Sequence, residues 1–497
     1  MAENPHRTSA RTRLTASIVA CAFFMQNLDS TVIATALPTM AQAFGADPIH
    51  MNIALTAYML SLAVFIPASG WVADRFGVRT IFRAAIAVFT IGSVLCGLSE
   101  SLPQLIGARI LQGAGGAMMV PVGRMLILRT TPKAELIAAM AWLTTPALIG
   151  PVLGPPIGGF IVTYFSWRWI FYINIPIGLI GMVLVSLFVE NIREPARGAL
   201  DWRGQIMCGI GLAGLMFGLQ TVGRGVIPFA ATVALLGVGL MGTTAFAIHA
   251  RRHPAPLLDF SLLREKTFAV ALSAMFLFRA GIGAIPFLLP LMLQIGFGET
   301  AVQSGLVTFA SSAGALVMKP AAQRMLRWFG FRDILFWNAL LSGVMLAACA
   351  AFRPTWPAAV IFGILLVGGF FRSLQFTAYN TLAYADIPRA RVSAATSLYS
   401  TVQQVALTMG VAVGATALEL TMLAASHSVP QPMDFSVAFL VIAGFCAAAG
   451  PVARLLPGNA GAELTGHGVS GGGHEKGGSP EKILAPAPSD QSPSSRV

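Results

Sequence analysis

The stretch GWVADRFGVR, Gly70–Arg79, places one acid and two arginines between two long apolar runs. The chain of 497 residues around it is 56% hydrophobic and only 10% charged, whereas soluble domains contain about 25% charged residues. A helix that crosses the hydrocarbon core of a bilayer needs roughly 20 apolar residues, and the sequence contains many such runs. The composition therefore predicts an all-α polytopic membrane protein, with the charged stretch as a short loop between two membrane helices.

Fourteen apolar ranges are long enough to be transmembrane helices: 14–37, 51–73, 80–98, 102–128, 136–164, 168–189, 203–221, 228–248, 267–294, 302–327, 332–352, 357–385, 391–423 and 434–456. If the N-terminus is cytoplasmic, most arginines and lysines of the connections fall on the inner side, as the positive-inside rule requires. The even count predicts that both termini are cytoplasmic. Because the basic residues lie at the ends of apolar runs, the net charge of +12 does not indicate a nucleic-acid partner.

Two pairs of short segments recur along the chain at nearly equal spacing. LPTMAQAFG at 37–45 resembles LPLMLQIGFG at 289–298, and FGVRTIF at 76–82 resembles FGFRDILF at 329–336. Parallel repeats of this kind are typical of transporters built from two similar halves. The sequence therefore predicts two parallel six-helix bundles with two further helices inserted between them.

The repeat and the composition divide the chain into five predicted parts. These are a cytoplasmic N-terminal segment at 1–13, an N-terminal six-helix bundle at 14–189, a linker with two extra transmembrane helices at 190–266, a C-terminal six-helix bundle at 267–456 and a cytoplasmic tail at 457–497. The tail is rich in Gly, Ser and Pro and has no apolar periodicity, so we expect it to be disordered.

The charged loop follows the spacing G-x-x-x-D-R-x-G-x-R. Its members are Gly70, Asp74, Arg75, Gly77 and Arg79. Glycine permits a tight turn and close packing, and a carboxylate is favourable at a helix N-terminus. The alternative is an ordinary positive-inside loop that contains one incidental acid. In the second half, Arg327 falls where Asp74 would align, so only the first half carries the complete loop.

Four further stretches carry a resemblance to a known family: LDSTVIATALP at 28–38, ARILQGAGGAMMVP at 108–121, GPVLGPPIGG at 150–159 and SWRWIFYINIPIG at 166–178. Together with the loop, they resemble the fourteen-span drug:proton antiporter family of the major facilitator superfamily, the EmrB/QacA type, over residues 14–456. The resemblance implies the major facilitator fold and alternating access in the cytoplasmic (inner) membrane. It also implies that the loop acts as an inner gate, and it suggests a periplasmic adaptor protein as a candidate partner beside membrane lipid.

The run at 150–159 matches the antiporter motif of the resembled family. The residues concerned are Gly150, Pro151, Gly154, Pro155, Gly158 and Gly159. Each proline removes a helix donor and favours a bend, while glycines allow another helix to approach closely. This combination suits a hinge or a sliding contact in a rocking transporter. The alternative is an ordinary kinked membrane helix.

Asp29 and Arg109 are charged residues at similar depth within the ranges 14–37 and 102–128. Charges inside a membrane are costly and usually face a cavity or a partner, and the resembled fold places both helices at the central cavity. Burial favours the neutral form of Asp29, whereas a nearby Arg109 favours the charged form. We therefore predict Asp29 and Arg109 as the proton-coupling pair. The alternative is a static ion pair.

Polar residues in other spans are candidates for the substrate cavity. They are Gln26, Gln112, Asn174, Arg279, Gln294, Arg372 and Gln375. Arg279 and Arg372 lie in cavity helices of the resembled fold and have no matching acid, so we expect a neutral, zwitterionic or anionic substrate. Alternatively, these arginines bind backbone carbonyls or extend toward the membrane surface. Lys319 and Glu419 also lie within spans, without an assigned role.

The sequence contains no GxxxxGK[ST] loop, no GxSxG elbow and no dinucleotide fingerprint. It therefore predicts no enzyme, no metal and no cofactor, with a proton gradient as the energy source. The leading hypothesis is a proton-coupled antiporter that exports small amphipathic compounds or drugs across the cytoplasmic membrane. Two alternatives stay open: a dedicated exporter of one metabolite, such as an antibiotic, siderophore or aromatic acid, and a non-transporting membrane receptor or channel.

Overall fold

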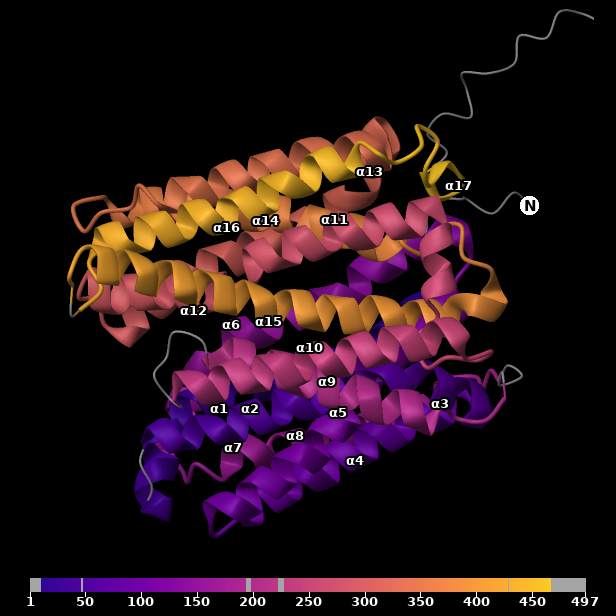
Figure 1. Ribbon diagram of the computed structural model, residues 1–497, viewed down its shortest axis with the longest axis horizontal. Helices are drawn as coiled ribbons and strands as arrows, with labels where there is room; N and C mark the ends of the chain where they lie inside the picture. The colour runs from indigo at the N-terminus through magenta and orange to yellow at the C-terminus, as the bar shows by residue number, and fades with distance from the viewer. Residues whose placement is uncertain (1–9, 46–47, 194–197, 222–227, 428, 466–497) are drawn as a thin grey trace, which may run out of the picture.

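The computed structural model describes residues 10–45, 48–193, 198–221, 228–427 and 429–465. This part of the chain is mostly helical and contains no strand. Figure 1 shows long helices that run in nearly the same direction, with the N-terminal half on one side and the C-terminal half on the other. The all-α class predicted from composition is confirmed.

The helices follow the predicted order. The first half contains α1 (Ala10–Phe44), α2 (Pro48–Phe65), α3 (Ser69–Phe76), α4 (Val78–Leu98), α5 (Leu102–Thr130), α6 (Leu136–Tyr164), α7 (Trp169–Tyr172) and α8 (Asn174–Phe188). The inserted pair is α9 (Trp202–Thr221) and α10 (Phe229–Arg252). The second half contains α11 (Lys266–Gly283), α12 (Ile285–Leu291), α13 (Ala301–Cys349), α14 (Ala358–Leu382), α15 (Val392–Ala424), α16 (Pro432–Ala453) and α17 (Ala462–Thr465).

Short non-α turns connect several of these helices: η1 (Ile66–Ala68), η2 (Lys133–Glu135), η3 (Phe260–Arg264), the π-helical η4 (Met292–Gly296) and η5 (Arg389–Arg391). Side-chain caps fix some helix starts. Thr300 Oγ1 accepts from Gln303 N, and Gln303 Oε1 accepts from Thr300 N at 2.9 Å. This capping box satisfies donors that the first turn of α13 leaves free.

Twelve segments of the described residues are long and apolar enough to cross a membrane. One of them, Gln303–Cys349, has 47 residues, which is about 70 Å of helix and far more than one crossing needs. It is interrupted at Gly330, where φ is 72°, so α13 contains two successive helices. Each of the fourteen predicted ranges lies in helical structure, while the count of fourteen crossings stays a prediction.

The internal repeat has a structural counterpart in four glycines with positive φ. Gly45 and Gly298 have φ values of 61° and 73°, and Gly77 and Gly330 have values of 94° and 72°. These are the matching positions of the two repeated segments, and left-handed backbone favours glycine at such places. The two halves therefore share the same turns, and the predicted domain boundaries stay a prediction.

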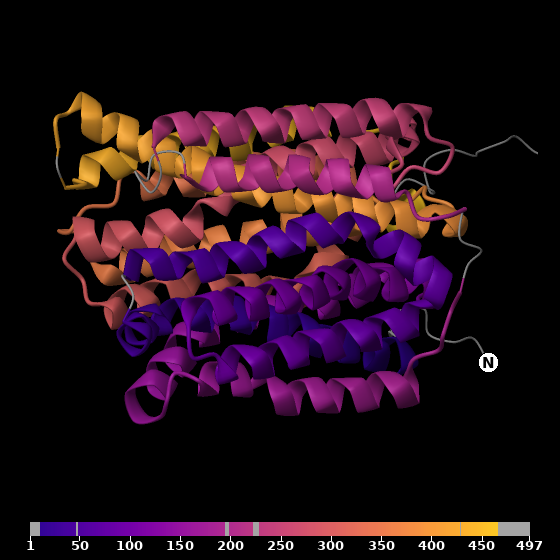
Figure 2. The same ribbon diagram turned by 60° about the horizontal axis from the view of Figure 1, so that its bottom comes forward.

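The inserted helices α9 and α10 pack against each other through glycine. A Cβ atom on Gly214 would lie 2.8 Å from Gly239 Cα, so the two backbones approach as closely as in small-residue membrane interfaces. The α9 helix also contacts α2 of the first half and α15 of the second. Figure 2 shows the pair on the outside of the molecule, along the seam between the halves.

The main apolar core extends through both halves and includes the buried side chains of Phe82, Phe89, Phe278 and Phe331. A second apolar cluster contains Leu28, Val32 and Phe171. These three residues come from α1 and α7. The cluster therefore packs against α1, the helix that carries Asp29.

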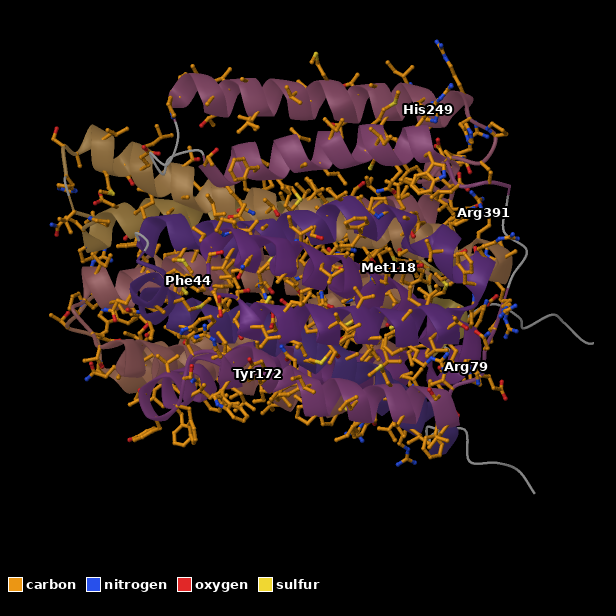
Figure 3. The ribbon with its side chains drawn as sticks, turned by 90° about the horizontal axis from the view of Figure 1, so that it is seen from below. Phe44, Arg79, Met118, Tyr172, His249 and Arg391 are labelled. Carbon is orange, nitrogen blue, oxygen red and sulfur yellow. The ribbon has the colours of Figure 1, made fainter. Side chains whose placement is uncertain are left out.

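Opposite ends of the molecule differ in character. Figure 3 places Arg79, His249 and Arg391 at one end, and Phe44 and Tyr172 at the other. The positive-inside rule assigns the first of these ends to the cytoplasm, and we call it the inner end. The orientation in the membrane stays a prediction.

The predicted terminal segments are partly helical in the structure. Helix α1 is described from Ala10, so it includes the last residues of the predicted N-terminal segment 1–13, whose cytoplasmic position stays a prediction; residues 1–9 lie outside the described part of the chain. The disordered tail does not begin at 457, because Leu464 of α17 is only 3% exposed and Glu463 forms an ion pair with Lys133. Residues 466–497 lie outside the described residues.

Candidate functional site

Asp29 lies at the centre of a buried polar cluster between α1, α5 and α8. Arg109 Nη1 donates to Asp29 Oδ2 at 2.6 Å, while Gln112 Nε2 and Asn174 Nδ2 each donate to Oδ1 at 2.8 Å. Asp29 is 3% exposed, and its three partners are fully buried. The structure thus brings the predicted pair Asp29–Arg109 together with Gln112 and Asn174, which were predicted as cavity residues. We call Asp29, Arg109, Gln112 and Asn174 the Asp29 cluster.

Two further side chains complete this cluster, and sequence reasoning missed both. Ser93 Oγ of α4 accepts from Gln112 Nε2 at 2.8 Å, and the ring centroid of Tyr58 in α2 lies 4.3 Å from the Arg109 guanidinium carbon. Stacking on an aromatic face is favourable for a guanidinium. In the sequence, Ser93 and Tyr58 are each a single polar or aromatic residue within a predicted span. Many other residues fit that description, so these two could not be selected from it.

The cluster stabilises a carboxylate at membrane depth, because hydrogen-bond donors and a cation favour the charged form of an acid. It also contains unused capacity. Among the described residues, Arg109 Nε and Nη2 are buried and have no hydrogen-bond partner. Buried donors normally have partners, so these two atoms are unusual for a packed interior.

The antiporter motif in α6 packs directly beside Asp29. A Cβ atom on Gly150 would lie 2.9 Å from Leu28 N, and one on Gly154 would overlap the Thr31 side chain. Gly158 is buried. Gly159 has nothing within 4 Å of its Cβ position, so the prediction of close packing is wrong there. Pro151 and Pro155 lie in α6, but their side chains are outside the described part of the structure, and the hinge stays a prediction.

The charged loop connects the first half to α15 of the second half. Asp74 Oδ1 accepts from Arg129 Nη2 at 2.7 Å, and Asp74 Oδ2 accepts from the Ser393 hydroxyl. Gly70 N donates to Ser397 Oγ at 2.8 Å. We call these contacts, between residues 69–74 and Ser393 or Ser397, the inner seam. Asp74 reaches the first turn of α15, as expected for an acid that favours a helix N-terminus.

Close approach at the inner seam requires glycine at position 70. A Cβ atom there would lie 2.7 Å from both Ser393 O and Ser397 Oγ. Gly77 supplies the turn, with a φ of 94°. Arg79 Nη1 donates to Val189 O at 3.3 Å within the first half, and Arg75 is exposed. Only part of the loop motif therefore bridges the halves.

Arg124 of α5 also joins the two halves at the inner end, and sequence reasoning missed it. Its guanidinium donates to Tyr384 Oη and Gln403 Oε1 at 3.3 Å each and to Ser400 Oγ at 3.4 Å. The side chain is buried, with its guanidinium carbon 5.0 Å from the Tyr399 ring centroid. Arg124 lies near the end of the predicted range 102–128. In the sequence it resembles one of the basic residues that follow the positive-inside rule, which is why its contacts were not predicted.

Arg279 and Arg372 lie in the second half without an acidic partner. The guanidinium carbon of Arg279 lies 4.4 Å from the Phe376 ring centroid, and Arg372 Nη2 donates to Ser311 Oγ at 2.6 Å. Arg372 lines a small cavity of about 30 Å³ with Ser311, Ser342 and apolar neighbours. Within the described residues, no carboxylate forms an ion pair with either arginine.

The other predicted cavity residues are placed differently. Gln375 Nε2 donates to Leu335 O and Tyr379 Oη at 3.0 Å each, and its Oε1 accepts from Asn338 Nδ2 at 2.7 Å. Gln375 is fully buried by these contacts between α13 and α14, and its role as a cavity residue stays a prediction. Gln294 is exposed in η4 and takes no part in the Asp29 cluster. Gln26 is partly buried.

Three comparisons with known proteins agree with this architecture. The family model described as the Major Facilitator Superfamily matches residues 19–411. The chain is 40% identical over 405 residues to proteins named "Putative multidrug resistance protein MdtD" from Escherichia coli (strain 55989 / EAEC) and Shigella sonnei (strain Ss046). Each match covers 81% of this chain and 85% of the relative.

Solved structures show the same fold at low sequence identity. The human organic anion transporter MFSD10 (TETRAN) superposes with a TM-score of 0.65 at 14% identity, over 90% of this chain and 100% of that one. The proton:xylose symporter XylE gives a TM-score of 0.65 at 15% identity, over 92% and 98% of the two chains. The matched family consists of transporters rather than enzymes. The chain is a multi-pass membrane transporter that belongs to the Major Facilitator Superfamily.

Proposed function

We propose that the protein is a proton-coupled antiporter that exports small amphipathic compounds across the cytoplasmic membrane by alternating access. The observation that carries this proposal is a buried carboxylate, Asp29, held by donors from two other helices. The relatives named for multidrug resistance support export of drug-like compounds. The resemblance to drug:proton antiporters supports a proton gradient as the energy source, and it alone supports a periplasmic adaptor.

Coupling follows from the electrostatics of the Asp29 cluster. When Asp29 binds a proton, Arg109 loses its counterion in a buried site, which is strongly unfavourable. Arg109 must then move, gain water or bind an acceptor on the substrate. When the substrate leaves, the pairing of Arg109 with an ionised Asp29 is restored. Arg109 thus pairs with ionised Asp29 in one conformational state and with the substrate in the other. A shift in population between two states requires such a difference in binding.

The inner seam supports the alternating-access part of the proposal. In this structure the inner end is joined by Asp74 with Ser393, Gly70 with Ser397, and Arg124 with three neutral acceptors. None of these contacts is an ion pair, and the Lys133–Glu463 pair that also joins the two parts of the chain is exposed, so the inner end can open at modest cost. We infer that the structure is closed on its inner side and that substrate enters after these contacts separate.

The test is transport by reconstituted protein with and without Asp29→Asn. Proteoliposomes with an imposed pH gradient are loaded with lipophilic dyes or aromatic acids, and efflux and proton movement are followed together. Asp29→Asn should abolish pH-driven efflux, while the variant folds and inserts. Asp434→Asn is the matched control, because Asp434 is a buried acid that pairs with His427 far from the Asp29 cluster in sequence. Undiminished coupled efflux by Asp29→Asn contradicts the proposal.

A second candidate is a dedicated exporter of one anionic metabolite. The observation that favours it is the charge of the second half, where Arg279 and Arg372 have no acidic partner in the part of the chain that the structure describes. Uncompensated buried cations suit an anionic ligand. A transport panel that compares lipophilic cations, neutral compounds and aromatic carboxylates distinguishes this candidate from a multidrug exporter.

A further inference from the structure

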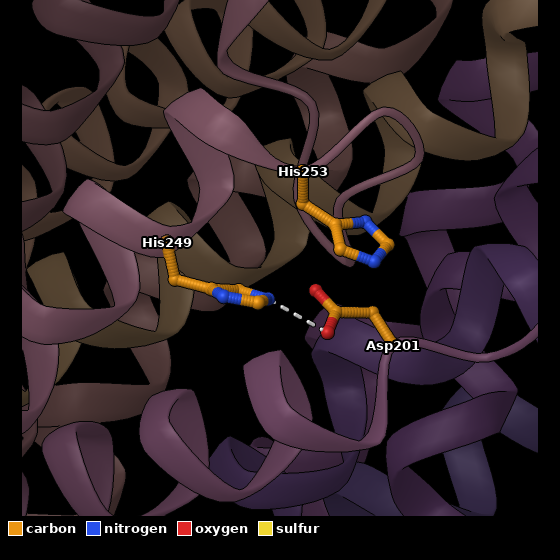
Figure 4. Close-up of side chains that lie close together, drawn as sticks. All are labelled: Asp201, His249 and His253. Carbon is orange, nitrogen blue, oxygen red and sulfur yellow. Dashed lines mark hydrogen bonds and ion pairs between the residues drawn. The ribbon is translucent and has the colours of Figure 1, made fainter.

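A group of three potential metal ligands lies at the inner end, where the two inserted helices meet (Figure 4). Asp201 precedes α9, His249 lies in the last turn of α10 and His253 follows α10. One ligand atom from each residue lies within 4.8 Å of the others. The transport mechanism uses none of these residues. The sequence predicted no metal, because Asp201 is remote from the two histidines along the chain.

The two histidines have the spacing of a helical metal site. Residues four apart lie on the same face of a helix, and two histidines at i and i+4 form a metal-binding pair in known helical motifs. Their ring centroids lie 5.2 Å apart. Asp201 faces them from the start of the neighbouring helix, so the three side chains converge from two helices on one point.

Asp201 has a buried oxygen without a partner. Its Oδ1 accepts from Gly204 N at 2.8 Å and from His249 Nε2 at 2.9 Å. Its Oδ2 is buried and has no hydrogen-bond partner in the described residues. The whole residue is only 6% exposed. A buried carboxylate oxygen without a donor is an incomplete site.

We propose that Asp201, His249 and His253 form a binding site for a divalent transition-metal ion, such as Zn²⁺ or Co²⁺. Imidazole nitrogen and carboxylate oxygen are ligands that Zn²⁺ prefers, and three protein ligands leave a fourth position for water. Metal–ligand bonds of about 2.0–2.2 Å require the ligand atoms to draw closer together than they lie here. The metal replaces the proton that His249 shares with Asp201.

One local change accompanies coordination by His253. Its Nδ1 accepts from Ala255 N at 3.2 Å, and Figure 4 shows the other ring nitrogen on the side of Asp201. A metal on Nε2 places the imidazole proton on Nδ1, so the bond from Ala255 is lost. That bond is at the long end of the normal range, and the loop after α10 adjusts at small cost.

The site borders the inner seam. Asp201 and His253 line a cavity of about 880 Å³ together with Asp74, Ser393 and Arg391. A metal at this place fastens the start of α9 to the end of α10 beside the contacts that close the inner end. The expected role is regulatory: a metal ion from the cytoplasm stabilises the closed seam and slows transport. Metal binding itself does not depend on the proposed proton coupling.

The test is Co²⁺ binding to full-length protein in detergent, purified without a polyhistidine tag. Ligand-field absorption of Co²⁺ reports nitrogen and oxygen coordination, and Zn²⁺ should displace one equivalent. His249→Gln should weaken binding by about tenfold or more, since even the loss of an outer partner of a metal ligand costs 10–100-fold. His253→Gln provides a second variant should the first fail to fold.

Two controls separate this site from other histidines. His427→Gln removes a histidine that pairs only with Asp434, and His467→Gln with His474→Gln removes those of the C-terminal tail. Both controls should retain one equivalent of bound Co²⁺. The proposal is overturned if the wild-type protein does not bind Co²⁺ at micromolar concentration, or if binding survives in both His249→Gln and His253→Gln. Proton-coupled efflux without metal should be unchanged in these two variants, which keeps this test separate from that of Asp29.

Discussion

The two halves have similar turns and opposite polar interiors. In the first half, the Asp29 carboxylate and the Arg109 guanidinium neutralise each other within 2.6 Å. In the second half, Arg279 lies against an aromatic ring and Arg372 against a serine hydroxyl. One interior is a closed ion pair that one proton can disturb, and in the described part of the other the two arginines contact an aromatic ring and a hydroxyl.

This contrast shows which features of a repeat are retained and which diverge. The glycines at 45 and 298, and at 77 and 330, hold the same left-handed backbone in both halves. The acid of the loop motif has no counterpart, because Arg327 stands where Asp74 aligns. The two halves therefore share backbone turns and differ in where their acids and arginines lie.

The largest effect is expected from Arg109→Gln, which removes the cation from the first half. Asp29 then keeps a buried negative charge without its counterion, and breaking a buried pair in this way costs about 3–5 kcal/mol. Efflux should be lost and thermal stability should fall. The double variant Asp29→Asn with Arg109→Gln should regain stability but not transport. An equally unstable double variant contradicts a dominant role of the ion pair.

A smaller effect is expected from Arg279→Gln and Arg372→Gln, which make the second half neutral. Export of anionic aromatic compounds should weaken by about tenfold for each lost charge contact, equivalent to roughly 1.4 kcal/mol, while export of neutral dyes should change little. Arg353→Gln is the matched control, because Arg353 donates to the Ala350 and Phe352 carbonyls. Unchanged transport of anions in both variants removes the argument for an anion-selective second half.

The inner seam should respond more weakly to Ser397→Ala. This change removes the acceptor of Gly70 N and the hydroxyl partner of Ser69, which lies 2.9 Å away. The loss of such bonds costs about 1–3 kcal/mol where a donor stays buried. The inner end should open more often, which thiol labelling of a cysteine introduced at position 394 can measure. Ser400→Ala, next to Arg124, provides a comparison on the same helix.

The smallest effect is expected at Asp259, which links η3 to the second half. Burial raises the pKa of Asp259, but the hydrogen bonds from Ser261 and Arg391 lower it by more. The pKa of Asp259 therefore lies below its ordinary value. Its stabilising contribution is therefore present above the unfolded pKa of about 3.9 and is lost as pH falls through the folded value. In Asp259→Asn, the free energy of unfolding should fall less between neutral and acidic pH than in the wild type. The difference should be less than about 1 kcal/mol, measured by thermal scans from neutral pH downward. An unchanged acid profile contradicts this assignment.

The sequence predicted the Asp29–Arg109 pair because charge is rare in apolar spans. Asp29 and Arg109 stand out in such ranges, and matched depth suggested a pair. Ser93 and Tyr58 were not predictable, since single polar or aromatic residues occur throughout the spans. The contact of Gln375 with Asn338, a neighbour in space but not in sequence, was not predictable either.

Long-range contacts at the inner end were also beyond the sequence. Arg124 meets its partners more than 250 residues further along the chain, and its role depends on how the two halves close. The Asp201–His249 contact joins residues 48 positions apart. Periodicity and composition predict the helices, whereas such pairings follow from tertiary packing.

The lack of space at Gly70 has a practical consequence. Any side chain introduced there acts as a wedge between α3 and α15, because Ser393 O and Ser397 Oγ each lie 2.7 Å from the position of a Cβ atom. A bulky residue such as leucine would then hold the transporter open toward the cytoplasm without altering a single charge. One substitution thus yields a conformational trap for capturing the opposite state and for measuring substrate affinity on that side.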